Sequence, residues 1–357
     1  ERTGGYYLPM LTGSIVAYSR SIEQLAEDLL IIRPTILVTV PRIFERVYNK
    51  IKLQLEEKPA FARKLFNAAV NAGWQHFLQQ QGREHKTLPL LFWPLLQRLV
   101  GHKIMQKLGG RLRLAVSGGA PLSLDVAQTF IGLGLTIVQG YGMTELSPVV
   151  SSNRIKGNDP ASVGPPLPDV EVKLGKDNEL LVHSPGIMLG YWNNPEATAE
   201  IIDDDGWLHT GDIAHIEHDH IYITGRLKEI IVLANGEKIP PADMELAICT
   251  DPLFEQAMIV GEGKPFLSAL VVLNRDNWKK LAEAFVVPAD DETSLDDPDI
   301  QNELLKRIKE KLAVFPGYAK IFRVVATLEP WTVEAGLITP TLKLKRNCMI
   351  DRYEDII

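Results

Sequence analysis

This chain of 357 residues has few cysteines, no excess of basic over acidic residues and no long apolar run. Its two cysteines, Cys249 and Cys348, are too few for a disulfide framework. Such usage is typical of a reducing compartment, so we expect a cytoplasmic protein. Lys and Arg number 38 against 45 Asp and Glu, a net charge of −7. Because proteins that bind nucleic-acid phosphates usually carry a basic excess, no nucleic-acid partner is expected. The sequence contains no run of about eighteen apolar residues, so it predicts no transmembrane helix.

Three widespread catalytic signatures are also missing from the sequence. It contains no GxxxxGK[ST] phosphate loop, no GxGxxG dinucleotide turn and no GxSxG nucleophile elbow. Four histidines gather in one stretch: His209, His215, His218 and His220. They lack cysteine partners and the paired spacing of metal ligands, so we expect no metal site there.

The first 150 residues are expected to form a parallel α/β unit. Ser21–Gln24 has the pattern of a capping box before a helix, and Thr35–Val40 is a β-branched run. Pro41 is placed to open a second helix. Later come a predicted strand (112–116), a tight turn (117–121), a helix capped by Ser123 and a strand (135–138). Strand, helix and strand in this order predict a site at the carboxyl edge of a parallel sheet.

After Pro148 the pattern changes twice. Short alternating runs predict a small antiparallel β-barrel or sandwich over residues 151–227, with strands at 170–174, 179–183, 213–217 and 221–224. Residues 228–357 predict an α+β domain. Its expected strands are 230–233, 257–260, 268–273 and 323–328. One expected helix begins at Pro240, and two more cover 276–285 and 302–315. Asn235-Gly236 is expected to form a hairpin turn. The acidic segment 290–299 is expected to be an exposed loop, and the tail 330–357 to be loop-like.

Four separated segments share residue types that suit a nucleotide phosphate ester. Gly118-Gly119-Ala120 would let a flat ring approach the backbone. Gly140-Tyr141-Gly142 offers an aromatic face between two flexible joints, which suits stacking on adenine. Thr144 supplies a hydroxyl for a phosphate oxygen, and Glu145 supplies a carboxylate of the kind that Mg²⁺ prefers.

The remaining two segments contribute one charge of each sign. Asp212 is expected at the start of a strand, where it could accept both ribose hydroxyls, and Arg226 follows fourteen positions later. Each piece alone has an ordinary interpretation: a turn, a core tyrosine or a surface charge. Their order and spacing together indicate a nucleotide site.

Four sequence segments resemble the adenylate-forming superfamily of acyl-CoA synthetases, luciferases and peptide-synthetase adenylation domains. They are YGMTE (141–145), GWLHTGDIA (206–214), GRLKEIIVLANGEKIPP (225–241) and TPTLKLKR (339–346). Within the superfamily, the ERTGGYY start, the long helical segment 42–108, the SGGAPL turn and the TLKLKR ending look like long-chain fatty acyl-CoA synthetases. The resemblance implies that fatty acid and ATP form an acyl-adenylate and pyrophosphate. Coenzyme A (CoA) then takes the acyl group and releases AMP.

The resemblance also implies a role for each matching residue. Lys343 matches the lysine that bridges the substrate carboxylate and the α-phosphate, with Lys345 as its rival. Lys228 matches the hinge between the two domains, and Gly236 would let the pantetheine thiol pass. The implied nucleotide and metal residues are Gly119, Ala120, Gln139, Gly140, Tyr141 and Thr144 for adenine and phosphate, Glu145 for Mg²⁺, and Asp212 and Arg226 for ribose.

The sequence departs from the family in one respect. It contains no Ser/Thr/Gly-rich phosphate loop, and Leu11–Ser14 is too short to replace one. We therefore expect only part of the large N-terminal domain, with boundaries at 1–150, 151–227 and 228–357, and little acyl-adenylate formation by this chain alone. Ligation of another acid, transfer to a carrier protein and a non-catalytic AMP-binding or regulatory role stay open. The apolar segment Leu88–Val100 is expected to be a packed helix, although an acyl tunnel or peripheral membrane contact, including the inner membrane face, stays open.

Overall fold

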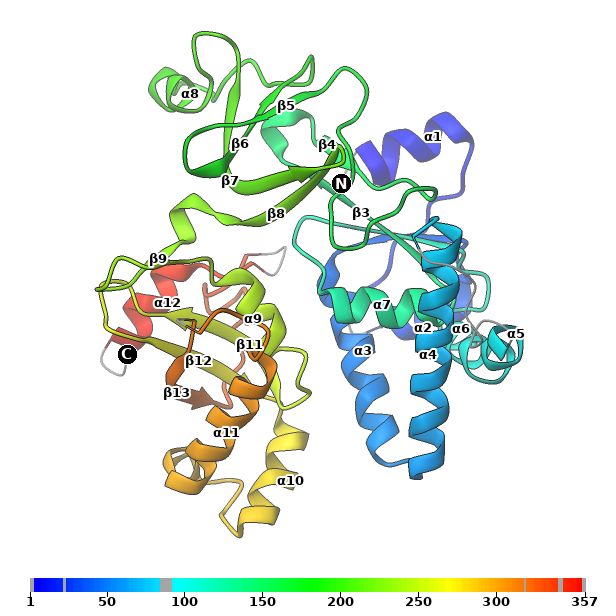
Figure 1. The fold of residues 1–357 in the computed structure, drawn as a ribbon, viewed down its shortest axis with the longest axis vertical. Coiled ribbons are helices and arrows are strands. Elements are labelled where there is room, and N and C mark those ends of the chain that lie inside the picture. Colours follow the sequence, from blue (N-terminus) through cyan, green and yellow to red (C-terminus); the bar gives the residue numbers. More distant parts are fainter. Residues whose placement is uncertain (1–2, 22–23, 84–91, 318, 340–342, 355–357) are drawn as a thin grey trace. The chain divides into compact units, whose positions relative to one another are not determined.

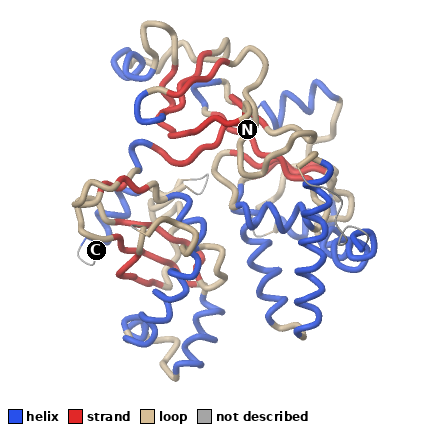
Figure 2. The backbone as a smooth tube through the Cα atoms, in the orientation of Figure 1, coloured by secondary structure: helices blue, strands red, loops and turns tan. Residues whose placement is uncertain are grey.

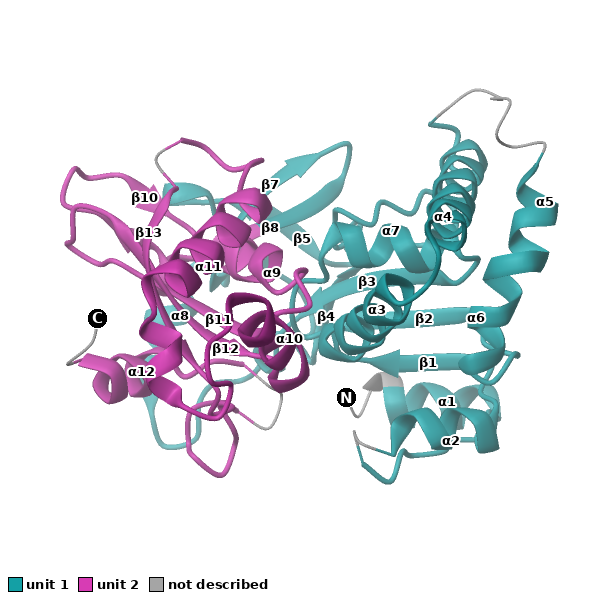
Figure 3. Ribbon diagram, turned by 90° about the horizontal axis from the view of Figure 1, so that it is seen from below, with its two compact units in different colours: residues 1–223 teal, residues 224–357 magenta. Residues whose placement is uncertain are grey.

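A computed structural model describes residues 3–21, 24–83, 92–317, 319–339 and 343–354. The chain divides into two compact units, residues 1–223 and residues 224–357 (Figure 3). Among the described helices, none is long and apolar enough to cross a membrane.

The first sheet of unit 1 has the order β1-β2-β3-β4. Strands β1 (Ile36–Thr39), β2 (Leu114–Gly118) and β3 (Thr136–Gly142) are parallel, and β4 (Val149–Ser152) is antiparallel to β3. Helix α7 (Leu124–Gly132) connects β2 to β3, which confirms the predicted strand, helix and strand. Gly118 lies opposite Gly140, so the carboxyl ends of β2 and β3 are adjacent.

Helices pack against this sheet around one apolar core (Figure 1). The core includes Phe44 of α3 and Phe130 of α7, whose rings meet edge to face 5.6 Å apart. Glycines let two helices approach closely, because a Cβ on Gly73 of α4 would lie 1.9 Å from the carbonyl oxygen of Gly132 of α7. The helical segments described before β2 are α1 (Leu8–Thr12), α2 (Leu25–Ile32), α3 (Pro41–Glu56), α4 (Ala60–Gln80), α5 (Trp93–Leu96) and α6 (His102–Lys107), with π-helical turns at Thr3–Tyr7 and Gln97–Gly101. Helix α1 buries no residue.

The second sheet of unit 1 is an antiparallel half-barrel of order β5-β6-β7-β8 (Figure 2). Its strands are β5 (Glu171–Leu174), β6 (Glu179–His183), β7 (Leu208–Glu217) and β8 (His220–Arg226), and helix α8 covers Pro195–Ile201. Burial alternates along β7 from Leu208 to Ala214, as expected of a strand with one face on a core. Asp212 was expected at the start of a strand, which is wrong: β7 begins at Leu208, so Asp212 lies within the strand on its buried face.

Unit 2 is built on a three-stranded sheet, and three of its helices pack on one face. Strand β12 (Leu267–Leu273) lies between antiparallel β11 (Phe254–Val260) and parallel β13 (Ile321–Thr327). Side chains of α9 (Ala242–Ile248), α10 (Arg275–Phe285) and α11 (Pro298–Lys311) form a core on one face. The predicted Asn235-Gly236 hairpin is present between β9 (Ile231–Val232) and β10 (Lys238–Ile239).

The expectation that residues 330–357 are loop-like is wrong. Trp331, Ile338 and Met349 are buried against the other face of the unit 2 sheet, and α12 covers Arg346–Tyr353. Segment 290–299 is likewise no simple exposed loop, because Glu292–Asp296 is a 3-10 turn with Leu295 in the core. Both segments bury isolated apolar residues, which leave no periodic pattern in the sequence.

The capping box predicted at Ser21 is confirmed in part, because the Ser21 hydroxyl accepts the Gln24 amide at 3.2 Å. Residues 22 and 23 lie outside the described part, and helix α2 begins at Leu25. Two other local predictions need correction. The turn predicted at 117–121 starts later, because residues 117 and 118 belong to β2. Of the apolar segment 88–100, residues 88–91 lie outside the described residues. In the rest, Trp93 is buried while Leu95 and Leu99 are exposed.

Candidate nucleotide site

The carboxyl edge of the parallel sheet brings two of the predicted segments together. Gly118 ends β2 beside Gly140 of β3, and Gly119 and Ala120 follow directly. Gly119 has φ +84°, and a Cβ there would meet nothing within 4 Å. The backbone at Gly119 is therefore open to a flat ligand, and its positive φ favours glycine.

The two glycines that flank Tyr141 have a different role from the predicted one. Both lie in β3 and pair with β4, so they are not flexible joints. A Cβ on Gly142 would lie 1.9 Å from the carbonyl oxygen of Pro148, and one on Gly140 would lie 3.2 Å from that of Ser151. These glycines are needed where β4 crosses close to β3.

Gln139 lies beneath this edge, with only 7% of its surface exposed. Its Nε2 donates to the carbonyl oxygen of Pro160 at 2.6 Å, and its Oε1 accepts the amide of Leu122 at 3.2 Å. The side chain thus connects the segment after β2 to the segment that holds Pro160. In this structure Gln139 supports the loop that carries Gly119 and Ala120.

Tyr141 and Asp212, 71 positions apart, are in direct contact. The hydroxyl of Tyr141 donates to Oδ2 of Asp212 at 2.6 Å. Asp212 is 5% exposed, and its amide donates to Thr210 Oγ1 at 3.1 Å. This bond links the parallel sheet to the half-barrel. It places the carboxylate of Asp212 beside Tyr141, between Gly140 and Gly142 of β3.

Glu145 lies in a short 3-10 turn, Thr144–Leu146, that follows β3. Its backbone oxygen accepts the amide of Met188 at 2.8 Å, and its Oε1 accepts the hydroxyl of Tyr191 at 2.8 Å. Because the hydrogen bond to Glu145 stabilises the protonated phenol, the pKa of Tyr191 is raised above its usual value. Sequence reasoning missed Tyr191, since nothing local connects it to a carboxylate 46 positions away.

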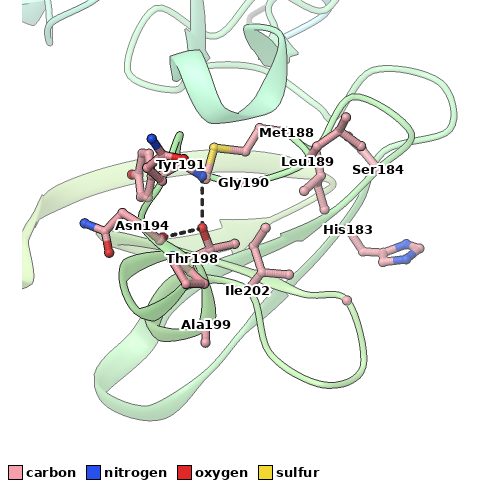
Figure 4. Close-up of a pocket in the computed structure, with 14 residues that line it drawn as sticks. His183, Ser184, Met188, Leu189, Gly190, Tyr191, Asn194, Thr198, Ala199 and Ile202 are labelled. Atoms are coloured by element: carbon pink, nitrogen blue, oxygen red, sulfur yellow. Dashed lines mark hydrogen bonds between the residues drawn. The ribbon is translucent and has the colours of Figure 1, made fainter.

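A hollow of about 800 Å³ lies beside this contact, and it was also missed. Gly190, Tyr191, Asn194 and Thr198 line it together with His183 and Ile202 (Figure 4). The Thr198 hydroxyl accepts the amide of Tyr191 and donates to the carbonyl oxygen of Asn194, each at 2.9 Å.

The ligand that this region offers is the carboxylate of Glu145, an oxygen donor that suits Mg²⁺ better than a transition metal. In the described part of the chain, no three His, Cys, Asp or Glu side chains form a metal-binding group. Mg²⁺ commonly binds one or two carboxylates together with substrate phosphates and water, and Glu145 can supply such a carboxylate. Three of the four histidines have separate partners. His209 Nδ1 lies 2.9 Å from a carboxylate oxygen of Glu179, and His220 Nε2 lies 3.0 Å from the Gly157 carbonyl oxygen. The His215 ring stacks on Tyr222.

The other predicted residues belong to unit 2. Arg226 ends β8, and Lys228 lies in the 3-10 turn Leu227–Glu229 with its side chain exposed. Gly236 has φ +84° at the tip of the β9–β10 hairpin, and a Cβ there would meet nothing within 4 Å. The turn is therefore exposed and open to close approach, as its predicted role requires.

Residues 340–342 lie outside the described part, and Lys343 follows them directly. Its amide donates to Thr339 Oγ1 at 3.0 Å, and its carbonyl oxygen accepts the Thr339 amide at 2.8 Å. Lys343 and Lys345 are both exposed. Arg346, three residues on, is held by Glu245 at 2.5 Å and by the Ile259 carbonyl at 3.1 Å.

Comparison with known proteins gives a consistent result. Residues 1–192 match the family "AMP-binding enzyme", and residues 228–357 match "AMP-binding enzyme C-terminal domain". The long-chain-fatty-acid–CoA ligase FadD15 of Mycobacterium bovis is 34% identical over 348 residues, or 95% of this chain and 56% of that ligase. The peroxisomal long chain acyl-CoA synthetase 7 of Arabidopsis thaliana is 34% identical over 349 residues, or 92% of this chain and 49% of that synthetase.

A solved structure shows the same fold at lower identity. The adenylation domain of a carboxylic acid reductase from Segniliparus rugosus, in complex with AMP and a co-purified carboxylic acid, has a TM-score of 0.68 and 24% identity. The match covers 96% of this chain and 49% of that one. The chain spans about half the length of the curated relatives it matches.

Proposed function

Because this chain belongs to the AMP-binding enzyme family, we propose that its protein is an acid–thiol ligase that joins a fatty acid to CoA through an acyl-adenylate. The observation that carries the proposal is the contact between Tyr141 and Asp212 beside the open backbone of Gly119. In the proposal, Asp212 would serve as the acceptor for sugar hydroxyls and the backbone of Gly119 as the open surface for a flat ring. The names of the relatives support a long-chain fatty acid as the acid.

The unit 1 residues divide the binding of ATP and AMP among them. Adenine would lie over Gly119 and Ala120, with Tyr141 beside it and Gln139 supporting the loop beneath. Asp212 would accept the ribose hydroxyls, and Thr144 would donate to a phosphate oxygen. Glu145 would hold Mg²⁺, which supplies positive charge next to the phosphates.

Two anionic groups must meet in the first step, so catalysis depends on positioning and charge stabilisation. A carboxylate oxygen of the acid attacks the α-phosphorus, and pyrophosphate leaves. We assign Lys343 to bridge the two anions, because a lysine is a compact charge on a flexible stem. In the second step the CoA sulfur attacks the acyl carbon, and AMP leaves with the carboxylate oxygen.

Domain roles follow from the same proposal. We assign residues 1–150 to the large α/β domain, 151–227 to its half-barrel and 228–357 to a mobile C-terminal domain. Arg226 would contact the ribose at the boundary, and Lys228 would be the hinge. Rotation there would withdraw Lys343 and bring the Gly236 turn to the thiol.

Substrate and acceptor are tested in one experiment. In the intact gene product, ATP–pyrophosphate exchange is measured with straight-chain acids of increasing length, and the activated acid is then offered CoA or a phosphopantetheinyl carrier protein. The proposal predicts exchange with long-chain acids and transfer to CoA. Exchange with another acid class or transfer only to the carrier protein would contradict it, whereas AMP binding without exchange in the intact gene product would indicate a regulatory module.

A further inference from the structure

The loop that carries Glu145 lies against a second segment, residues 184–191. The amide of Met188 donates to the Glu145 carbonyl oxygen at 2.8 Å. A Cβ on Gly186 would lie 2.9 Å from the Leu146 carbonyl oxygen, so the two backbones are nearly in contact. The hydroxyl of Tyr191 adds a 2.8 Å hydrogen bond to Oε1 of Glu145.

Helix α8 fixes the backbone from which Tyr191 reaches Glu145. Thr198, on the first turns of α8, accepts the Tyr191 amide at 2.9 Å, and the Asn194 side chain caps the same helix by accepting the Ala197 amide at 3.0 Å. A Cβ on Gly190 would lie 3.0 Å from the Thr198 side chain. The backbone of Tyr191 is therefore held by the start of α8, although 39% of the residue is exposed (Figure 4).

We propose that Tyr191 is a positioning residue that orients the Glu145 carboxylate for a divalent cation. This inference rests on the proposed role of Glu145 as the Mg²⁺ ligand. Carboxylates that bind metals are commonly held by a hydrogen bond from a neighbouring group, which fixes the rotamer that the metal needs. The phenol holds Oε1 and leaves Oε2 without a hydrogen bond from the described residues.

A tyrosine suits this task because it donates without adding charge. An arginine or lysine in its place would neutralise Glu145 and compete with the cation. A tyrosine hydroxyl, with an ordinary pKa of about 10, carries its proton at neutral pH and can donate it to Glu145. Tyr191 thus orients the carboxylate and preserves its negative charge.

Direct metal binding tests the inference without relying on turnover. Mn²⁺ and ATP are brought to equilibrium by dialysis between the chain and a protein-free chamber, and the excess Mn²⁺ on the protein side is measured by electron paramagnetic resonance, so that chelation by free ATP is equal on both sides. Tyr191→Phe is expected to weaken Mn²⁺ binding about tenfold, the usual loss when such a supporting group is removed. AMP affinity without metal and the melting temperature should be unchanged, because the ring and its backbone anchor remain.

Tyr222→Phe is the matched control. It removes a hydroxyl from the same unit that also donates to a carboxylate, Asp159, at 3.0 Å, but outside the proposed site. Its Mn²⁺ affinity should equal that of the wild type. Glu145→Gln tests the underlying role separately and should abolish the Mn²⁺ site.

Each outcome decides one of the two statements. If Glu145→Gln abolishes Mn²⁺ binding while Tyr191→Phe leaves it unchanged, the role of Tyr191 is wrong and that of Glu145 stands. If Tyr191→Phe weakens metal-free AMP binding equally, or if Tyr222→Phe has the same effect, Tyr191 is only structural. If the wild type binds no Mn²⁺, or Glu145→Gln leaves binding intact, the assignment of Glu145 fails and the inference fails with it.

Discussion

Removal of the Tyr141 hydroxyl should loosen the junction between the two sheets of unit 1. The bond from Tyr141 to Asp212 is 2.6 Å long, and Asp212 is 5% exposed, so water cannot readily replace the lost donor. Hydrogen bonds to charged groups contribute about 1.5–3 kcal/mol. At about 1.4 kcal/mol per tenfold, Tyr141→Phe should raise the local opening equilibrium by roughly ten- to hundredfold.

Hydrogen exchange read by mass spectrometry measures this locally, which matters because a chain of two units need not unfold in one step. Peptides from β3 and β7 should exchange faster by that factor in Tyr141→Phe. Peptides from β12 in unit 2 serve as an internal reference and should not change. Tyr18→Phe is the control variant, since Tyr18 is 73% exposed and loses only a solvent-facing hydroxyl.

A double-mutant cycle with Asp212→Ala isolates the pairwise contribution. The two substitutions should be strongly non-additive, because either one removes the same bond. A coupling energy below about 0.5 kcal/mol, the size of ordinary surface effects, would mean that the bond from Tyr141 to Asp212 does not hold the two sheets together. The contact would then be too weak to place Asp212 for a ligand.

Three further predictions concern other parts of the chain. Gly142→Ala should lower the melting temperature, because its Cβ would lie 1.9 Å from the Pro148 carbonyl oxygen. The backbone would have to shift, at a cost of about 1–3 kcal/mol. An unchanged melting curve would contradict the close approach of β4 to β3 at this position. The Arg20 amide and guanidinium hold the pKa of Asp28 below its usual value. Stability from Asp28 is therefore present above its unfolded pKa of about 3.9 and lost as pH falls through the lower folded value, and Asp28→Asn should flatten the acid limb of a melting-temperature profile. Lys343→Ala should slow acyl-adenylate formation by the intact gene product and leave AMP binding nearly unchanged, whereas Lys345→Ala should have the smaller effect; the reverse order in pyrophosphate exchange would reassign the bridging lysine.

Local patterns predicted the elements that carry the site. The run of strand, helix and strand put Gly118 and Gly140 at one sheet edge, because parallel strands joined by a helix must end together. The alternating runs likewise predicted β5 and β6 closely. These predictions succeed because side-chain period and turn residues act over a few positions.

Contacts between distant segments could not be predicted in the same way. The partnership of Tyr191 with Glu145 depends on how segment 184–191 crosses the turn after β3, and no periodicity records that crossing. Burial of Trp331 and Met349 depends on the open second face of the unit 2 sheet, which becomes evident only when the strands are assembled. Asp212 was identified as a residue but misplaced along its strand, because the buried positions Thr210 and Asp212 are polar and hide the apolar alternation that would have extended β7 back to Leu208.

If Gly119, Gly140 and Asp212 form a ribonucleotide site, isothermal titration of the chain with AMP and with 2′-deoxy-AMP should distinguish the two nucleotides. We expect one AMP per chain and binding at least about tenfold weaker for the deoxy form. Asp212→Ala should show no such difference, because the lost hydroxyl is the one that Asp212 accepts. Equal affinity for the two nucleotides in the wild type, or a difference that survives in Asp212→Ala, would contradict such a site.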